Sequence, residues 1–251
     1  MKDLLLVLSS GRTGTHKLST ILADVPGMYA EHEGDPGFHL VREKNSIDPS
    51  IGSHFVEKKI SFFKAQGKEH IAHTGHMAGE GFFEHFIDQG IIPNVIILRR
   101  PAREVALSMF KLNWIPGRNE LLRAWYRGPD EKNVLPYHEW KAATSYQLCY
   151  WWALDTEYRI QQHMPLILKH HVKIYETTLN GILNIQELNS LLKFFNLSEI
   201  ESIPQNKVNH LELYRTLNKP TPPDDYLTKV ENEVHERTNT PRSISQSSQR
   251  Y

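Results

Sequence analysis

Short apolar runs alternate along the chain with longer segments in which apolar residues recur at near-helical spacing. The apolar runs predict strands at Leu4 to Leu8, at His70 to Thr74, at Val95 to Leu98 and at His171 to Tyr175. Residues 27–37 are short of apolar side chains and end in turn formers, which suggests a brief strand that breaks into a loop. The amphipathic segments predict helices over residues 18–25, Asp48 to Gln66, Phe82 to Gly90, Pro101 to Phe110, Tyr146 to Gln162 and Ile185 to Phe195. Val95 to Leu98 does not alternate, which is typical of a parallel strand covered on both faces. The order of the elements predicts an α/β protein of three layers, with helices on both faces of a mostly parallel central sheet.

The composition changes near the C-terminal end of the chain. Three prolines fall within residues 220–223, and residues 242–251 are rich in Ser, Gln and Arg with hardly any apolar side chain. Such a segment buries too little apolar surface to order itself. We therefore expect one folded domain over residues 1–218, followed at residues 219–251 by a proline-containing extension with a disordered tail. A short helix is expected around Tyr226 to His235.

Composition and charge exclude several classes of protein. The 251 residues are 39% hydrophobic, which suits one α/β domain, and the 29 Lys and Arg balance the 29 Asp and Glu. No global field attracts nucleic acid or an anionic membrane, so an anion site must be locally concentrated. The single Cys149 excludes a disulfide framework and a Cys-rich zinc site. No run reaches the roughly 18 apolar residues of a membrane helix, so we expect a cytoplasmic protein with no nucleic-acid partner and no membrane span.

Residues 9–18 (SSGRTGTHKL) follow the first predicted strand and open the first helix. A glycine-bearing turn can aim backbone N–H groups at an anion, and the helix N-terminus adds to the attraction. The ATP-binding pattern GxxxxGK followed by Ser or Thr is not met, because His16 stands at the second glycine and Leu18 at the hydroxyl position. The strand at residues 95–98 ends in Arg99 and Arg100, where positive charge is unfavourable unless an anion binds. The two segments predict a pair of anion sites that use no metal.

Two of these segments resemble the donor-binding motifs of sulfotransferases, the enzymes that use 3′-phosphoadenosine 5′-phosphosulfate. Residues 10–15 (SGRTGT) are similar to the 5′-phosphosulfate loop of that family, and residues 100–108 (RPAREVALS) to its 3′-phosphate segment. Residues 172–179 (VKIYETTL), followed by an amphipathic helix and residues 195–197 (FNL), are similar to its late strand and closing helix. The resemblance implies a P-loop-like sulfotransferase fold over roughly residues 4–200.

The resemblance also implies roles for individual residues. Arg12 would stabilise the charge that develops on the bridging oxygen during sulfuryl transfer. The 5′-phosphate would be held by Gly11, Arg12, Thr13, Gly14, Thr15 and His16. The 3′-phosphate would be held by an arginine together with Ser108. Pro101 follows Arg100 at once, whereas the proline of the family usually lies two residues after the arginine, so either Arg99 or Arg100 can fill that place.

The acceptor hydroxyl must lose a proton, so a base is expected nearby. Glu33 is the first candidate, because residues 32–34 (HEG) resemble the His-Glu-Pro element of bacterial and carbohydrate sulfotransferases, with glycine in place of proline. His73 or His76 is the second candidate. On an extended segment Glu31 and Glu33 would share one face and His32 the other.

Several alternatives remain open at this point. The series His70, His73 and His76 has spacing that could suggest a metal, but no Cys or paired carboxylate completes a tetrahedral set, so no metal site is expected. The acceptor would be a hydroxyl-bearing small metabolite or a glycan. A P-loop small-molecule kinase and a non-catalytic nucleotide-binding protein of the same fold are the rival functions. Aromatic residues within 111–137 could line an acceptor pocket or anchor a loop, and those of the helix at residues 146–162 are expected to pack on the sheet.

Overall fold

The computed structural model of the protein describes residues 1–204 and 220–240. They form two compact units, a first unit of residues 1–99 and 162–204 and a second unit of residues 100–161 and 220–240. The predicted boundary between residues 218 and 219 and the predicted tail at residues 242–251 lie outside the described residues.

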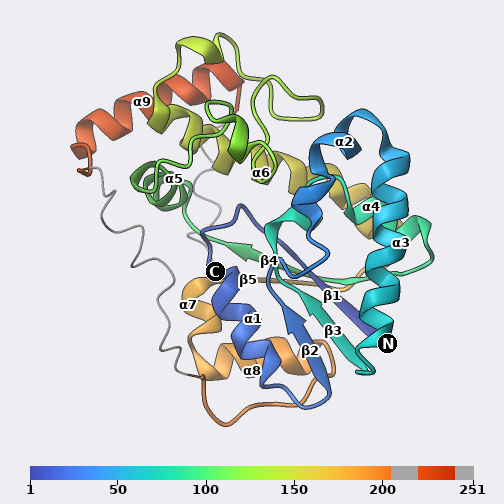
Figure 1. Ribbon diagram of the computed structural model, residues 1–251. Helices are drawn as coiled ribbons and strands as arrows, with labels where there is room; N and C mark the ends of the chain where they lie inside the picture. The colour runs from blue at the N-terminus through green and yellow to red at the C-terminus, as the bar shows by residue number, and fades with distance from the viewer. Residues whose placement is uncertain (205–219, 241–251) are drawn as a thin grey trace. The chain divides into compact units, whose positions relative to one another are not determined.

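The first unit is built on a sheet of five parallel strands (Figure 1). The strands are β1 (Asp3–Leu8), β2 (Met28–Glu31), β3 (His70–His73), β4 (Asn94–Arg99) and β5 (Ile174–Thr178). Their order across the sheet is β2-β3-β1-β4-β5, which places β1 at the centre. The apolar run at residues 4–8 is buried on both faces, as the sequence predicted.

Helices cover both faces of this sheet. The helices of the first unit are α1 (Thr15–Ala23), α2 (Arg42–Ile47), α3 (Pro49–Ala65), α4 (Phe83–Asp88), α7 (Leu179–Ile182), α8 (Ile185–Phe194) and the end of α6 (Ser145–Lys169). On one face, strand residues such as Val7 and Ala72 lie in one buried cluster with Leu22 of α1 and Leu191 of α8. On the other face, a group of aromatic rings from α3, α4 and the short 3-10 helix η1 (Phe38–Leu40) surrounds His73. The predicted three-layer α/β/α fold with a parallel sheet is confirmed.

Predicted and observed boundaries differ by a few residues at several elements, and most of all at the end of α6. Helix α6 continues beyond Gln162 to Lys169, because its last turns still bury an apolar side chain, that of Ile167. β5 then begins at Ile174, three residues later than predicted, because His171 adopts a left-handed backbone (φ 52°) just after the helix. The short helices α2 and α7 carry too few turns to leave a periodic pattern in the sequence.

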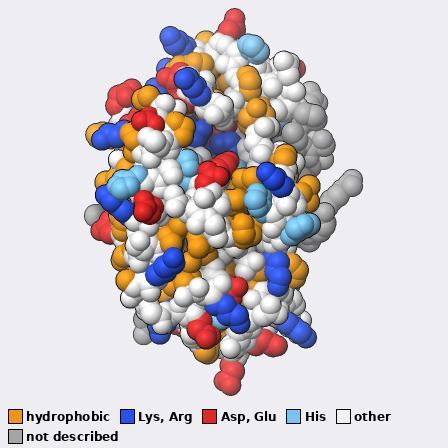
Figure 2. Space-filling model, turned by 90° about the vertical axis from the view of Figure 1, so that its right-hand side faces the viewer, with side chains coloured by type: hydrophobic (Ala, Val, Ile, Leu, Met, Phe, Trp, Pro, Cys, Tyr) orange, Lys and Arg blue, Asp and Glu red, His pale blue; other side chains and the backbone are white. Residues whose placement is uncertain are grey.

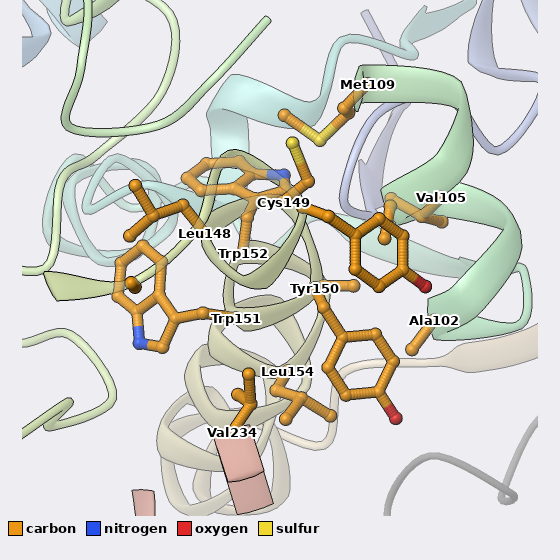
Figure 3. Packing of buried hydrophobic residues seen from close by; sticks show 14 of the residues in the cluster. Ala102, Val105, Met109, Leu148, Cys149, Tyr150, Trp151, Trp152, Leu154 and Val234 are labelled. Atoms are coloured by element: carbon orange, nitrogen blue, oxygen red, sulfur yellow. The ribbon is translucent and has the colours of Figure 1, made fainter. Parts of the chain in front are cut away.

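The second unit has a core of its own, shown in Figure 3. It contains α5 (Ala102–Lys111), the first part of α6, α9 (Asp224–Thr238) and the 3-10 helices η3 (Glu120–Leu122) and η4 (Trp140–Ala142). Trp151 and Trp152 of α6 are fully buried there. The ring of Trp152 meets Tyr126 edge-on at 5.1 Å between centroids, and Trp114 and Trp125 pack against the same cluster. Of the two predicted roles for the aromatic residues within 111–137, the structure thus supports the anchoring of a loop, and the aromatic residues of α6 pack on α5, α9 and this loop.

The helix predicted around Tyr226 to His235 is α9, and it is an integral part of the second unit. Its apolar side chains Leu227, Val230 and Val234 lie in the buried cluster. Its Glu231 accepts hydrogen bonds from Nε and Nη2 of Arg103 at 2.9 and 2.7 Å and from the hydroxyl of Tyr146 at 2.5 Å. Through Arg103, α9 is therefore fixed to the same helix, α5, that carries Ser108.

The surface carries mixed charge. On the face shown in Figure 2, basic and acidic side chains are interspersed, as the equal counts in the sequence lead one to expect. Within the described part of the chain, no helix combines the length and the apolar character needed to cross a membrane.

The packing of α9 gives a first prediction. Leu227→Ala removes a side chain that is 0% exposed, so we expect the free energy of unfolding to fall by about 2–5 kcal/mol through lost burial and a residual cavity. Tyr226→Ala is the matched control, because its side chain is 41% exposed, and it should cost less than about 0.5 kcal/mol. Urea unfolding followed by tryptophan fluorescence measures both. Equal, small effects would mean that α9 does not stabilise the folded protein.

Candidate functional site

The carboxyl edge of the sheet is where the predicted site residues of the first unit gather. All five strands are parallel, so the loops that follow them emerge at one edge. The chain passes from β1 to β2 and β3 on one side of β1, and then to β4 and β5 on the other. The switch point, where open α/β sheets usually bind ligands, therefore lies between β1 and β4. The predicted phosphate loop follows β1, and Arg99 is the last residue of β4.

The loop between β1 and α1 has an unusual backbone. Gly11, Arg12 and Gly14 all have positive φ angles, of 71°, 57° and 101°. A Cβ added to Gly14 would lie 2.5 Å from Cδ1 of Leu179, so both its conformation and its contact with α7 require glycine. Arg12 has no such freedom, and a non-glycine residue in the left-handed region is held there at a cost by its surroundings. Strain of this kind clusters at functional sites.

The same loop has the features of an anion site. Helix α1 starts at Thr15 with no side-chain cap and no acidic residue in its first turn. Thr13 is 1% exposed, and its buried Oγ1 has no hydrogen-bond partner among the described residues. Buried polar atoms normally form at least one hydrogen bond. An anion at the helix N-terminus would supply one, so the loop fits a bound phosphate group.

The predicted 3′-phosphate residues fall on both sides of the division between the units. Arg99 belongs to the first unit, and its Nε donates to Oε2 of Glu176 on β5 at 3.2 Å. Arg100 belongs to the second unit, and its Nε donates to Oε2 of Glu104 at 2.9 Å. Ser108 lies on α5, in the second unit. Each arginine is oriented by a carboxylate, and the choice between them stays open.

Glu31 is the last residue of β2 and the centre of a buried ionic cluster. Its Oε1 lies 2.6 Å from Nζ of Lys59 and 2.8 Å from Nδ1 of His73. Lys59 also donates to the carbonyl oxygens of Gly34 and Pro36 at 2.9 and 3.0 Å. Burial raises the pKa of the Glu31 carboxyl, but the hydrogen bonds and charges of its two partners outweigh burial and lower it. The Lys59 side chain therefore ties the loop after β2 to helix α3.

Glu33 lies in that loop, and its backbone is left-handed, with φ of 54°. The extended segment ends at Glu31, so the alternation of a strand does not extend to Glu33. The side chains of Glu31 and Glu33 therefore do not share a strand face, as the sequence had predicted they would. Its Oε1 lies 2.8 Å from Nδ1 of His76, and its Oε2 lies 3.9 Å from Nε2 of His32. Burial raises the pKa of the Glu33 carboxyl, but the hydrogen bond and charge of His76 outweigh burial and bring the pKa to about 2. Glu33 is therefore ionised at neutral pH.

The histidines around Glu33 differ in their surroundings. Burial lowers the pKa of His32 to about 4, so this ring is neutral at pH 7; its Nδ1 lies 3.3 Å from Oγ1 of Thr74. The ring of His16 meets that of His32 edge-on at 5.4 Å. His73 is 0% exposed, and burial lowers its pKa despite the neighbouring Glu31. His76 is 4% exposed, and its Nδ1 lies 3.4 Å from the place of a Cβ added to Gly11 of the phosphate loop.

The structure thus joins the predicted phosphate loop to the predicted base through His76. It places His73 in the buried Glu31 cluster, apart from the solvent. Within the described ranges, no group of three or more His, Cys, Asp or Glu side chains is arranged to hold a metal ion.

The sequence interpretation missed Lys59. This residue stands within an apolar helical stripe formed by Phe55, Val56, Ile60 and Phe63, at a position where a helix normally places an apolar side chain. A charged residue on the buried face of an amphipathic helix is the signal that could have found it, since such a residue needs a buried partner. Glu80 and Arg42, both 0% exposed, were missed for lack of any such signal.

Comparison with known proteins bears on the fold. No protein-family model matches the sequence, and no curated protein matches it. Among solved structures, the fold is similar to that of the sulfotransferase domain from the curacin biosynthetic pathway, with a TM-score of 0.53 and 13% sequence identity, over 96% of this chain and 99% of that chain. At this identity the likeness shows a shared fold, and it confirms the P-loop-like sulfotransferase fold expected from the sequence motifs.

The buried Glu31 cluster gives a second prediction. Lys59→Met removes the cation beside Glu31 and the donor to two carbonyl oxygens, so we expect the free energy of unfolding to fall by about 3–5 kcal/mol. Lys58→Met is the matched control, because Lys58 is an exposed neighbour on the same helix and should change stability by less than about 0.5 kcal/mol. Glu31→Gln should lower the free energy of unfolding less in the Lys59→Met variant than in the wild type. Urea unfolding of the wild type and the four variants measures these effects, and additive losses for Glu31→Gln and Lys59→Met would refute the pairing.

Proposed function

We propose that this protein transfers a sulfuryl group from 3′-phosphoadenosine 5′-phosphosulfate to a hydroxyl group of a carbohydrate or a small metabolite. The observation that carries the proposal is the pairing of an uncapped, glycine-bearing anion loop with an ionised carboxylate, Glu33, through one histidine, His76. The sulfotransferase fold supports the same function. The single cysteine of the sequence, the buried Cys149, fits a reducing compartment, and we propose a cytoplasmic location.

In this proposal the first unit holds the sulfated end of the donor. The donor supplies the SO₃ group and a phosphate leaving group. The backbone N–H groups of Gly11 to His16 and the unpartnered hydroxyl of Thr13 would bind the 5′-phosphate. The guanidinium of Arg12 would neutralise charge at the oxygen that leaves the sulfur. Arginine suits this task because its charge persists at all physiological pH values.

The remaining donor-binding role is assigned to an arginine and a serine after β4. Arg100 and Ser108 of the second unit, or Arg99 of the first, would bind the 3′-phosphate, which ATP lacks. The carboxylates that pair with the Nε atoms of Arg99 and Arg100 orient the two guanidinium groups. A guanidinium can bind a phosphate group through two parallel hydrogen bonds.

Glu33 is assigned as the acceptor of the hydroxyl proton. Its low pKa makes it a weak base toward a free hydroxyl, but it remains ionised at every pH at which the protein would work. As the acceptor oxygen bonds to sulfur, its proton becomes strongly acidic, and a carboxylate with a pKa of about 2 can then take it downhill. The burial of His73 and its contact with Glu31 favour a structural role for that histidine.

Donor recognition is tested by calorimetry with three nucleotides. We expect 3′,5′-adenosine bisphosphate to bind at least about 10-fold more tightly than 5′-AMP, because an arginine–phosphate pair contributes about 1.5–3 kcal/mol. ATP, with or without Mg²⁺, should bind no better than 5′-AMP. Tighter binding of Mg-ATP would favour a small-molecule kinase, and equal affinity for all three nucleotides would overturn the proposal.

Catalysis is tested at Arg12. Arg12→Ala should lower kcat for release of 3′,5′-adenosine bisphosphate by about 10²–10³-fold, because the lost donor acts on charge that develops in the transition state. Its affinity for the bisphosphate should fall much less, and Arg12→Lys should recover part of kcat. The assay follows bisphosphate release from the sulfated donor with a panel of sugar and phenolic hydroxyl acceptors. A wild-type protein that binds the bisphosphate but releases none with any acceptor would identify a non-catalytic binding protein.

A further inference from the structure

Four ionisable side chains form a series of contacts that leads from the phosphate loop into the interior of the first unit. Oε1 of Glu33 lies 2.8 Å from Nδ1 of His76, and Nε2 of His76 lies 3.5 Å from Oε1 of Glu80. Oε2 of Glu80 lies in turn 4.0 Å from Nε of Arg42 on α2. Glu80 and Arg42 are 0% exposed, and His76 is 4% exposed. Charges this deeply buried persist only when they compensate one another.

The geometry at His76 indicates its charge state. A histidine ring can donate from both nitrogens only as the imidazolium. Here each ring nitrogen faces a carboxylate oxygen, that of Glu33 on one side and that of Glu80 on the other. With His76 protonated, the signs along the chain alternate as minus, plus, minus, plus, and the four formal charges cancel. A neutral ring would leave one nitrogen lone pair facing a carboxylate.

His76 also lies against the phosphate loop. It begins the 3-10 helix η2 (His76–Gly79), which follows β3 at the carboxyl edge of the sheet. Its ring occupies the space beside Gly11, where an added Cβ would lie 3.4 Å from Nδ1. A Cβ added to Gly75 would lie 2.7 Å from Cγ of Glu33, so glycine there allows the carboxylate to approach. One ring thus contacts both the phosphate loop and the proposed base.

We propose that His76 is a positioning residue of the site: its imidazolium, anchored by Glu80 and Arg42, holds the Glu33 carboxylate in place and adds positive charge beside the phosphate loop. The catalytic meaning of this role rests on the proposed function. During transfer the O–S bond to the acceptor forms, the S–O bond to the leaving phosphate breaks, and the acceptor proton moves to Glu33. His76 keeps both of its protons and remains bound to the carboxyl group.

The role of His76 has a consequence for pH dependence. The groups that face Glu33 are His76, His32 and, at longer range, His73, and burial alone raises the pKa of its carboxyl. In the wild type these histidines, His76 foremost, bring that pKa to about 2, so Glu33 stays ionised as the pH falls from 8 to 4. Without His76 the Glu33 carboxyl stays buried, but the largest of the contributions that lower its pKa is lost. The pKa of Glu33 then rises toward or above its ordinary value of 4.5.

The test is a ¹³C NMR titration of the full chain labelled at the glutamate carboxyl carbons, with Glu33→Gln used to assign the Glu33 resonance. In the wild type this resonance should show no protonation between pH 8 and 4. In His76→Gln it should titrate within that range. His54→Gln is the matched control, because His54 pairs with a glutamate on the exposed surface of α3, and it should leave the Glu33 resonance unchanged.

A second variant keeps the proposal falsifiable if His76→Gln does not fold. Glu80→Gln removes the far anchor without touching Glu33, and it should shift the Glu33 titration in the same direction by a smaller amount. In the turnover assay either folded variant should lose activity as the pH falls from about 7 to 5, where the wild type stays level. A folded variant whose Glu33 resonance and acid limb match the wild type would overturn the proposal. Failure of the proposed function has a different signature: the variants still show the expected shift of the Glu33 titration, but the wild-type protein transfers no sulfuryl group.

Discussion

The burial of carboxylates at the carboxyl edge of the sheet is the constraint on which the site depends. Glu31 and Glu80 are withdrawn from water, and a carboxylate in such a place remains charged only beside a cation. Lys59 supplies the cation beside Glu31, which also pairs with Nδ1 of His73, and His76 and Arg42 meet the need for Glu80. These partners come from α2, α3, β3 and η2, so satisfying the charges fixes the elements that surround the site.

The same interactions hold a strained loop in place. Glu33 has a left-handed backbone, and such a residue keeps that conformation only where its surroundings determine it. After Glu33, Lys59 donates hydrogen bonds to the carbonyl oxygens of Gly34 and Pro36. The carboxylate of Glu33 itself pairs with His76. The ring centroids of Phe62 and Phe63 lie 5.2 and 5.1 Å from the Lys59 nitrogen, and the rings shield it from water. Structural ion pairs and the proposed chemistry are therefore parts of one network.

The second unit is held together mainly by the packing of apolar and aromatic side chains. Its core is aromatic, with Trp151 and Trp152 at its centre, and α9 closes it from a distant part of the sequence. The ionic contact of Arg103 with Glu231 fastens α9 to α5, whose other end carries Ser108. The composition assigned residues 219–251 to an extension, yet this part of the chain contains α9, which packs on α5, the helix that carries Ser108. The likeness to a sulfotransferase domain at 13% identity concerns the fold, so the argument for function depends on these side chains.

The sequence by itself determined the parallel strands, the main helices and the loop at residues 9–16, because hydrophobic periodicity and glycine spacing are local properties. It also named Glu33 as the first candidate base and His73 or His76 as the second, because a carboxylate or a histidine can accept the proton of a hydroxyl group. Only the tertiary structure decided that His76 pairs with Glu33 and His73 with Glu31, and that Lys59, Glu80 and Arg42 complete the network. Such pairs join residues far apart in the sequence. They depend on which strands lie side by side, and on the left-handed backbone of Glu33, which turns its side chain away from the alternation of a strand. No local pattern carries that information.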